Sequence, residues 1–195
     1  MKPRILRTAA AVLGLAALAA CSSAPVQYYT LASPAPAEAA AAPRAPFLIE
    51  VLPVGMPEML DRSQLVVRQG DAGVAVLDRQ RWASPLSDEL QAALSAQLAS
   101  QLGAPDTAGL PRQPGAAVWR IKVEVRRLDA WPGRQLLLDS DWAANLSSDA
   151  PTRLTCSSRI ALDAPADPAG LAEAHQTAVR QLAQQIAAAV RGRVC

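Results

Sequence analysis

The chain has 195 residues, of which 51% are hydrophobic, and its 19 basic and 17 acidic side chains give a formal charge of +2. Three of the basic side chains and no acidic one lie in residues 1–20, so the 175 residues that follow carry 16 basic and 17 acidic side chains, a net charge of −1. This balance excludes a basic nucleic-acid-binding protein, whose affinity for phosphates depends on clustered Lys and Arg. The length suits one domain, or two small ones.

The N-terminus has the pattern of a bacterial lipoprotein signal peptide, which we predict for residues 1–20. A basic segment precedes an apolar run that is too short to span a bilayer, which needs about 20 residues. Residues 18–21, Leu-Ala-Ala-Cys, match the lipobox, in which the peptide is cut before the cysteine. Cys21 would then carry a diacylglycerol and an N-acyl chain, more than the two signals that stable anchoring needs. The alternative is an ordinary secreted protein with a chance cysteine here.

The residues after Cys21 indicate where the protein is sorted and where its domain begins. Ser22 follows the anchor, whereas Asp there would often mark inner-membrane retention, so we expect the periplasmic face of the outer membrane. We predict a lipidated tether at residues 21–27 and a single domain at residues 28–195. Within that domain, residues 33–46 are rich in Pro and Ala and predict an exposed, semi-extended segment with no core of its own.

The first half of the domain has the pattern of short strands. Residues 47–54 are apolar and β-branched, which predicts a central strand that ends at the prolines. Residues 64–68 and 74–77 are further β-prone runs, and the segment 70–73 has glycine at both ends. Two such runs joined by a glycine turn predict a hairpin.

A long helix is predicted to begin at Pro85 and to end before Gly103. Ser84 is the candidate N-cap, Pro85 suits the first helical position, and the acidic Asp88 and Glu89 favour the positive end of the helix. Leucines recur at the helical period, at Leu86, Leu90, Leu94, Leu98 and Leu102. We expect this stripe to lie on a sheet rather than to form an interaction face.

From residue 118 onward the apolar residues alternate with a period of two, which predicts half-buried strands. The first runs through residues 118–126, a turn at Pro132-Gly133 joins it to residues 136–146, and a third follows at residues 154–162. Asp167 is the expected cap of a last helix. The whole pattern predicts an α+β fold of two layers, with a largely antiparallel sheet and two long helices packed on one face.

Cys156 and Cys195 remain once Cys21 carries lipid. In an exported protein they are candidates for a disulfide, which would close a loop of about 40 residues and stabilise the fold by about 3–4 kcal/mol. The alternative is a buried free Cys156 and a frayed Cys195. Because Cys156 belongs to the inward face of its strand, we expect it to point toward the helices.

The search for catalytic or metal-binding residues yields none. The single histidine, His175, lies on the apolar stripe of the last helix, where a core residue is expected. Asp139 and Asp141 share one face of a strand and could present two carboxylates to a metal or a sugar, but no nearby acid, base or ligand set is evident. No nucleophile elbow, His-Glu-x-x-His motif or phosphate loop occurs. We therefore predict that the protein is not an enzyme and holds no cofactor besides the lipid on Cys21.

The outward face of the strand from residue 118 is basic, with Arg120, Lys122 and Arg126, and Arg127 follows. Such a row could meet anionic headgroups or an acidic partner. Glu124 interrupts it, however, so we favour a solvated face.

Several motifs together resemble the PqiC-like family of ABC-type transport auxiliary lipoproteins. After the lipobox come Tyr-Tyr-Thr-Leu at residues 28–31, Leu-Asp-Arg-Ser-Gln-Leu at residues 60–65, and Trp-Ala-Ser-Pro-Leu at residues 82–86, the most specific of the three. The residues that carry the resemblance are Tyr28, Tyr29, Leu31, Asp61, Arg62, Trp82, Pro85, Leu86 and Trp142.

The resemblance implies an outer-membrane-anchored periplasmic lipoprotein that serves an MCE/ABC-type lipid transport system and supports envelope integrity. The expected partners are an MCE-domain protein, ABC transporter components and further copies in a ring, and residues 28–31 would belong to the domain. The competing hypothesis is a periplasmic carrier that holds an acyl chain in its own cavity. The predicted apolar stripes are no larger than a core requires, which argues against such a cavity.

Overall fold

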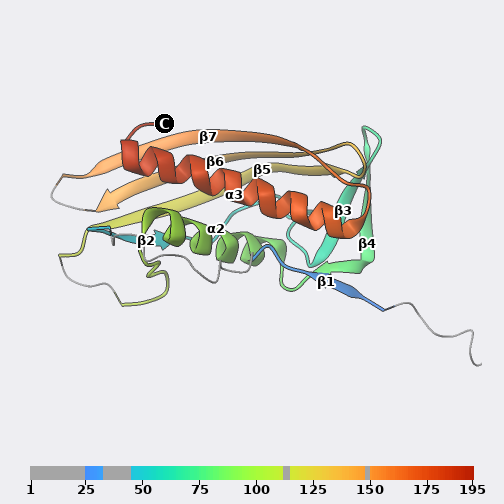
Figure 1. The fold of residues 1–195 in the computed structure, drawn as a ribbon, viewed down its shortest axis with the longest axis horizontal. Coiled ribbons are helices and arrows are strands. Elements are labelled where there is room, and N and C mark those ends of the chain that lie inside the picture. Colours follow the sequence, from blue (N-terminus) through green and yellow to red (C-terminus); the bar gives the residue numbers. More distant parts are fainter. Residues whose placement is uncertain (1–24, 33–44, 112–114, 148–149) are drawn as a thin grey trace, which may run out of the picture.

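The main sheet is built from three long strands that follow one another in the chain. β5 (Val118–Trp131), β6 (Gln135–Ser147) and β7 (Thr152–Asp163) pair antiparallel, and β2 (Leu48–Val51) completes a sheet of order β2-β5-β6-β7. Along β6, every second side chain is buried, as the alternating sequence predicts. The three long strands run almost the full length of the molecule (Figure 1).

The computed structural model describes residues 25–32, 45–111, 115–147 and 150–195. The predicted signal peptide, the anchor residue Cys21 and most of the predicted Pro/Ala-rich segment lie outside these ranges.

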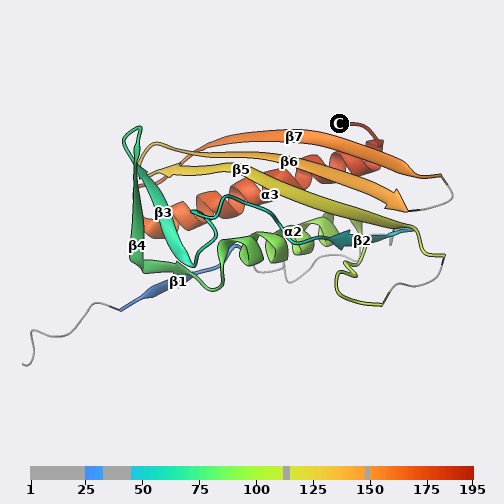
Figure 2. The same cartoon turned by 180° about the vertical axis from the view of Figure 1, so that it is seen from behind.

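A second, smaller sheet stands at one end of the main one, which the sequence did not predict. β3 (Gln64–Gln69) and β4 (Gly73–Trp82) form the predicted hairpin, and β1 (Gln27–Tyr29) adds to β4 as a parallel strand. The register shifts between Gln64 and Leu65, whose partners are Arg81 and Leu77. β4 therefore contains an irregular stretch, and the hairpin stands upright against the end of the main sheet (Figure 2).

The prediction of a central strand at residues 47–54 is wrong. β2 has only four residues, lies at the edge of the main sheet, and pairs parallel to β5. The chain continues along β5 without regular strand geometry, since Leu52 N donates to Ile121 O at 2.9 Å and Gly55 N donates to Val123 O at 3.0 Å. Pro53 lies between these two donors and has no N–H to contribute, which explains why the regular strand stops there.

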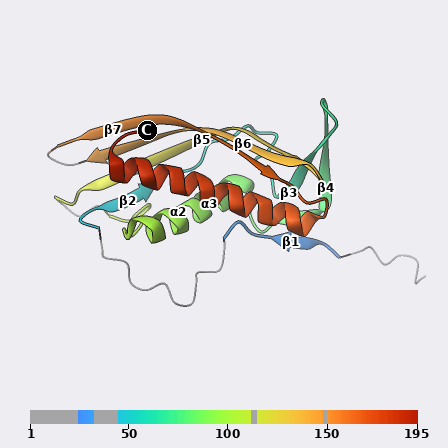
Figure 3. The same ribbon diagram turned by 45° about the horizontal axis from the view of Figure 1, so that its top comes forward.

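Two helices lie side by side across one face of the main sheet (Figures 1 and 3). They are α2 (Leu86–Leu102) and α3 (Pro168–Gly192). Asp167 caps α3 as predicted, because its Oδ1 accepts from Gly170 N at 2.8 Å. The predicted cap of α2 is wrong: Pro85 is the N-cap, and the Ser84 side chain does not bond to the amides of the helix.

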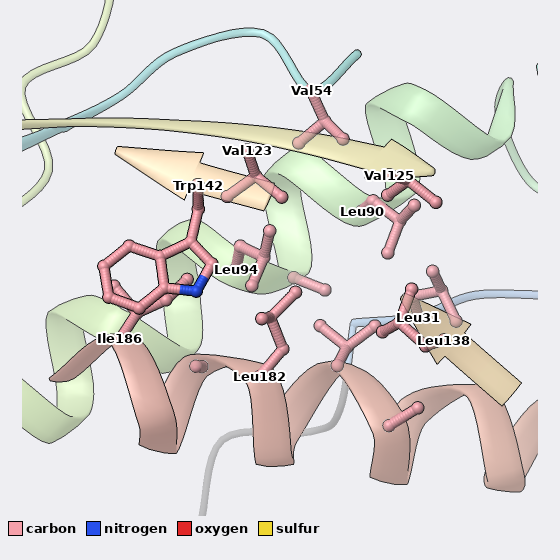
Figure 4. Packing of buried hydrophobic residues seen from close by; sticks show 14 of the residues in the cluster. Leu31, Val54, Leu90, Leu94, Val123, Val125, Leu138, Trp142, Leu182 and Ile186 are labelled. Atoms are coloured by element: carbon pink, nitrogen blue, oxygen red, sulfur yellow. The ribbon is translucent and has the colours of Figure 1, made fainter. Parts of the chain in front are cut away.

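One continuous core joins both sheets to both helices. Trp82 and Trp119 are among its largest fully buried side chains. Figure 4 shows Leu31, from the N-terminal segment, in the same cluster as Leu138 and Leu182. With mostly antiparallel strands and two helices on one face, the α+β fold class is confirmed. In the part of the chain that the structure describes, no helix is both long and apolar enough to cross a membrane.

Candidate functional site

The N-terminal segment that follows the predicted tether is built into the fold. β1 pairs with β4, with Tyr29 opposite Trp82, and Ala83 N donates to Tyr29 O at 2.8 Å. Two residues later Leu31 is only 3% exposed. We call the place where this segment meets the two helices the tether junction, which comprises Thr30, Leu31, Ser84, Glu89 and Gln176.

A buried carboxylate forms the centre of the tether junction. Glu89, from the first turn of α2, is 7% exposed. Its Oε2 accepts from Thr30 Oγ1 at 2.7 Å and from Leu31 N at 2.8 Å, while its Oε1 accepts from Ser84 Oγ at 3.1 Å. Burying a carboxylate is costly unless it is well hydrogen-bonded, so these three donors are what make the position tolerable. The carboxylate in turn fixes the backbone of the entering segment.

The second helix holds the same segment from another side. Gln176, on α3, donates from Nε2 to Thr30 O at 2.8 Å. Thr30 is therefore bonded to both helices, although it is 59 residues from Glu89 and 146 residues from Gln176. These contacts connect the N-terminal segment directly to the helical layer.

Trp82, which pairs with Tyr29 of the entering segment, also makes an aromatic contact with α3. The rings of Trp82 and His175 meet edge to face, with centroids 5.2 Å apart. Leu171 O can only accept, so the nitrogen 2.7 Å away, His175 Nδ1, must carry the proton. Burial lowers the pKa of His175 to about 4. The imidazole is a neutral core group, in agreement with the sequence prediction.

Asp61 takes the capping role that the sequence suggested for Ser84. Its Oδ1 accepts from Ser87 N, in the first turn of α2, at 3.2 Å. That amide is one of the donors that the start of a helix leaves without an intrahelical partner, and Pro85 offers no side-chain bond. Asp61 thus links the loop before β3 to the helix that carries Glu89.

Most of the sequence-predicted motif residues converge around this junction. Tyr29, Leu31 and Trp82 pack from the entering segment and β4, while Pro85 and Leu86 form the start of α2 and Asp61 caps it. Arg62 is next to Asp61 in the chain, and Tyr28 is 64% exposed on β1. Trp142 lies elsewhere: it is buried on β6, and its Nε1 donates to Ser158 Oγ at 2.9 Å.

Trp142 belongs to a groove near the chain's C-terminal end. The groove has a volume of about 420 Å³ and is lined mainly by apolar groups of β6, β7 and α3, among them Trp142, Cys156, Ala188, Ala189, Val194 and Cys195. We call it the far groove. The structure brings Cys156 and Cys195 together in a disulfide, with their Cα atoms 5.8 Å apart. Cys156 points toward the helical layer, from which the C-terminal residues return to meet it.

The two predicted carboxylates on β6 form ion pairs with arginines. Asp139 accepts from Arg127 Nη2 at 2.9 Å and from Arg159 Nε at 3.2 Å. Asp141 accepts from Ser157 Oγ at 2.7 Å and from Arg126 Nε at 2.8 Å, and these two hydrogen bonds lower its pKa. Across the described ranges, no group of three or more His, Cys, Asp and Glu residues is arranged to hold a metal ion.

The basic row on β5 is neutralised in the same way. Arg120 Nε lies 3.0 Å from Glu50 Oε2, and Lys122 Nζ lies 3.5 Å from Glu124 Oε2. The sheet face away from the helices is therefore a network of ion pairs rather than a patch of unbalanced positive charge. This agrees with the solvated face that the sequence favoured.

Comparison with known protein families identifies the family to which the chain belongs. A family model described as ABC-type transport auxiliary lipoprotein component matches residues 29–187, from β1 into α3. The chain belongs to this family. Its description assigns the protein an auxiliary role in transport and the character of a lipoprotein, in agreement with the resemblance found in the sequence. A search of curated proteins gave no match.

Two solved structures share the fold. One, of an uncharacterised protein, is 20% identical with a TM-score of 0.68, and the match covers 86% of this chain and 99% of that chain. The other, a Xanthomonas campestris protein of the DUF330 family, is 18% identical with a TM-score of 0.52, and the match covers 83% and 91%. At these identities the similarity establishes the fold alone.

Proposed function

We propose that the protein is a non-catalytic auxiliary subunit of an MCE/ABC-type lipid transport system, anchored by Cys21 to the periplasmic face of the outer membrane. The observation that carries this proposal is the family match over residues 29–187, which starts within β1. Gln27, the first residue of β1, comes only six residues after Cys21. The acyl chains are therefore at most about 20 Å of extended chain from the domain.

The polar groups of the described residues support a role in docking rather than in chemistry. His175 is neutral and buried, and Asp139 and Asp141 are each bonded to arginines. Glu89, the buried carboxylate of α2, accepts three hydrogen bonds from its own chain. A domain of this kind is suited to holding the periplasmic end of a transport assembly in place near its membrane.

Crosslinking in intact cells followed by purification from membranes tests the proposal. We expect the wild-type protein to retain an MCE-domain protein and ABC transporter components. We expect Cys21→Ser, which removes the anchor and leaves the domain intact, to lose most of that association. Recovery of the lipidated wild type without any such component, under conditions that preserve the assembly, would contradict the proposal.

The far groove favours a second candidate function, that of a lipid carrier. Its apolar lining and volume of about 420 Å³ fall within the range of small-molecule sites. Native mass spectrometry of the purified protein separates the two functions. Co-purified phospholipid that disappears in a variant with the groove filled, such as Ala188→Trp, would favour the carrier. Absence of bound lipid together with retention of the transport components would favour the auxiliary subunit.

A further inference from the structure

We infer that the exposed hydrophobic side chains at the tether end of the domain rest on the lipid surface that holds the anchor. The inference rests on the proposed anchoring at Cys21 and adds an orientation to it. The occupant of this surface is the phospholipid headgroup region of the membrane, not a protein partner.

The first observation is where the exposed hydrophobic side chains lie. In the described part of the chain, seven large hydrophobic side chains are exposed, and five of them belong to β1, the β3–β4 hairpin or the segments just before these strands. These five are Val26, Tyr28, Met59, Val74 and Val76. The other two, Leu110 and Val194, belong to the loop after α2 and to the C-terminal end, on the opposite side of the molecule (Figure 1). Single exposed apolar residues are ordinary, but their concentration at one end is not.

The hairpin residues share one surface. Val66 lies opposite Val76, and directly opposed residues of antiparallel strands point to the same face. Val74 is two residues from Val76 and so lies on this face too. Met59, Val66 and Val74 also line one hollow, together with Arg68 and with residues 126–130 of β5. We call Met59, Val66, Val74 and Val76 the hairpin patch.

The hairpin is fixed in its orientation by contacts with the main sheet. Arg68 Nε, on β3, lies 2.7 Å from Asp129 Oδ1 on β5. At the hairpin turn, Trp131 Nε1 donates to Gly70 O at 3.0 Å. Arg68 lies opposite Val74 and so on the face of the patch, whereas the other face of the hairpin, with Leu65 and Val67, is buried in the core. The patch therefore keeps one direction relative to the rest of the domain.

The length of the tether brings this surface to the membrane. At most about 20 Å of chain separates Cys21 from Gln27, and Gln27 lies opposite Gln80 at the base of the hairpin. Val76 comes four residues before Gln80, about 13 Å along a strand. The patch is therefore within reach of the headgroups whenever the anchor is inserted.

The chemistry of this end suits a lipid interface. Tyr28 has an apolar ring and a polar hydroxyl, a combination favoured at the level of the headgroups. Arg79 and Arg81 flank Gln80 at the base of the hairpin, with Asp78 beside them, so the stretch is net positive. Phosphate groups attract such a stretch, while valine and methionine side chains can enter the boundary of the acyl region.

Fluorescence quenching in vesicles tests the inference. The full-length lipidated protein is reconstituted into vesicles of phosphatidylethanolamine and phosphatidylglycerol with brominated acyl chains, which quench nearby tryptophan. Val76→Trp places a probe in the hairpin patch, and Leu110→Trp is the matched control at the opposite end. After subtraction of the wild-type signal, we expect at least about twofold stronger quenching for Val76→Trp, because side chains of a docked face enter the interface by about 5–10 Å.

Equal quenching of the two probes, or none for either, would overturn the inference. A decrease in the quenching of Val76→Trp as the protein concentration is raised would also overturn the inference. A second copy of the chain would then cover the patch in place of lipid. The vesicles contain no transport components, so failure here leaves the proposed transport role standing. Failure of the co-purification, with quenching preserved, would refute the transport role alone.

Discussion

The terminal segments at the two ends of the molecule are held to the rest of the fold by different interactions. At the tether end, the entering segment donates hydrogen bonds to Glu89, accepts one from Gln176, and is held by pairing of β1 with β4. At the far end, the residues after α3 return to β7 through a disulfide between Cys156 and Cys195. The difference teaches that the end nearest the proposed anchor depends on a buried polar network, which requires every partner to be present, whereas the C-terminal residues of the far end are held by a covalent link.

Removing the covalent link should have the largest effect. The disulfide joins residues 39 apart in the sequence, and a loop of that length stabilises a fold by about 4 kcal/mol in the chain-entropy model. We expect the double variant Cys156→Ser, Cys195→Ser to lose about 3–4 kcal/mol in the free energy of unfolding, measured by urea denaturation.

Mass spectrometry of the exported wild type, with and without reductant, provides the control. Two free thiols in the exported protein would refute the disulfide. Equal stability of wild type and double variant would show that the far end is closed by packing alone.

Removing the Glu89 carboxylate should come next. Glu89→Ala leaves Leu31 N buried without its acceptor and removes the acceptor of two hydroxyl groups, so we expect a loss of about 2–3 kcal/mol. Asp88→Ala is the matched control, because Asp88 is exposed in the same helical turn. It should cost less than about 1 kcal/mol. Comparable losses for the two variants would mean that the tether junction contributes little.

The pH dependence of stability tests the Trp82–His175 contact at the same end. The folded protein keeps His175 neutral down to a pH of about 4, whereas the unfolded chain takes up a proton below about pH 6.5. The stabilising contribution is thus complete above pH 6.5 and is lost as the pH falls toward 4. Between pH 6.5 and pH 5 we expect a loss of about 1.5 kcal/mol.

Urea denaturation at pH 7, 6 and 5 measures how the free energy of unfolding changes with pH, which we call the pH slope. His175→Gln should be less stable at neutral pH but should lack most of the slope in that window. If the variant kept the full slope, another group would be responsible for it.

The smallest effect is expected for Asp61, which caps α2 from a distance. Asp61→Ala removes the acceptor of Ser87 N and should cost about 1 kcal/mol, as loss of a helix cap does. Asp71→Ala, at an exposed position in the β3–β4 turn, should stay within about 0.5 kcal/mol of wild type. An Asp61→Ala variant with the same free energy of unfolding as the wild type would show that water replaces the Asp61 side chain as the acceptor of Ser87 N.

Local periodicity accounts for what could be predicted from the sequence. The alternation in β5, β6 and β7 and the leucine stripe of α2 were sufficient to predict the three long strands, the helices and the α+β class. These patterns depend on neighbours within a few residues and on burial of one face. The position of His175 on the apolar stripe of α3 likewise predicted its place in the core.

The tether junction was missed because its contacts are distant in the sequence. Glu89 bonds to Leu31 across 58 residues, and no local pattern encodes that pairing. One signal was present: Glu89 is three residues after Leu86 and four before Ala93, which places a charge on the apolar stripe. The parallel pairing of β1 and of β2 was missed for the same reason, since four residues or fewer carry too little periodicity to choose a partner.

Hydrogen exchange on the lipidated protein in vesicles tests most directly whether the segment after the proposed anchor is integral to the fold. The amides of Leu31 and Ala83 donate to Glu89 and to Tyr29 O. We expect both to exchange as slowly as the paired amides of β6, and to become selectively faster in Glu89→Ala. Exchange of these two amides in the wild type at the rate of an unprotected chain would contradict a domain held to its anchor through the tether junction.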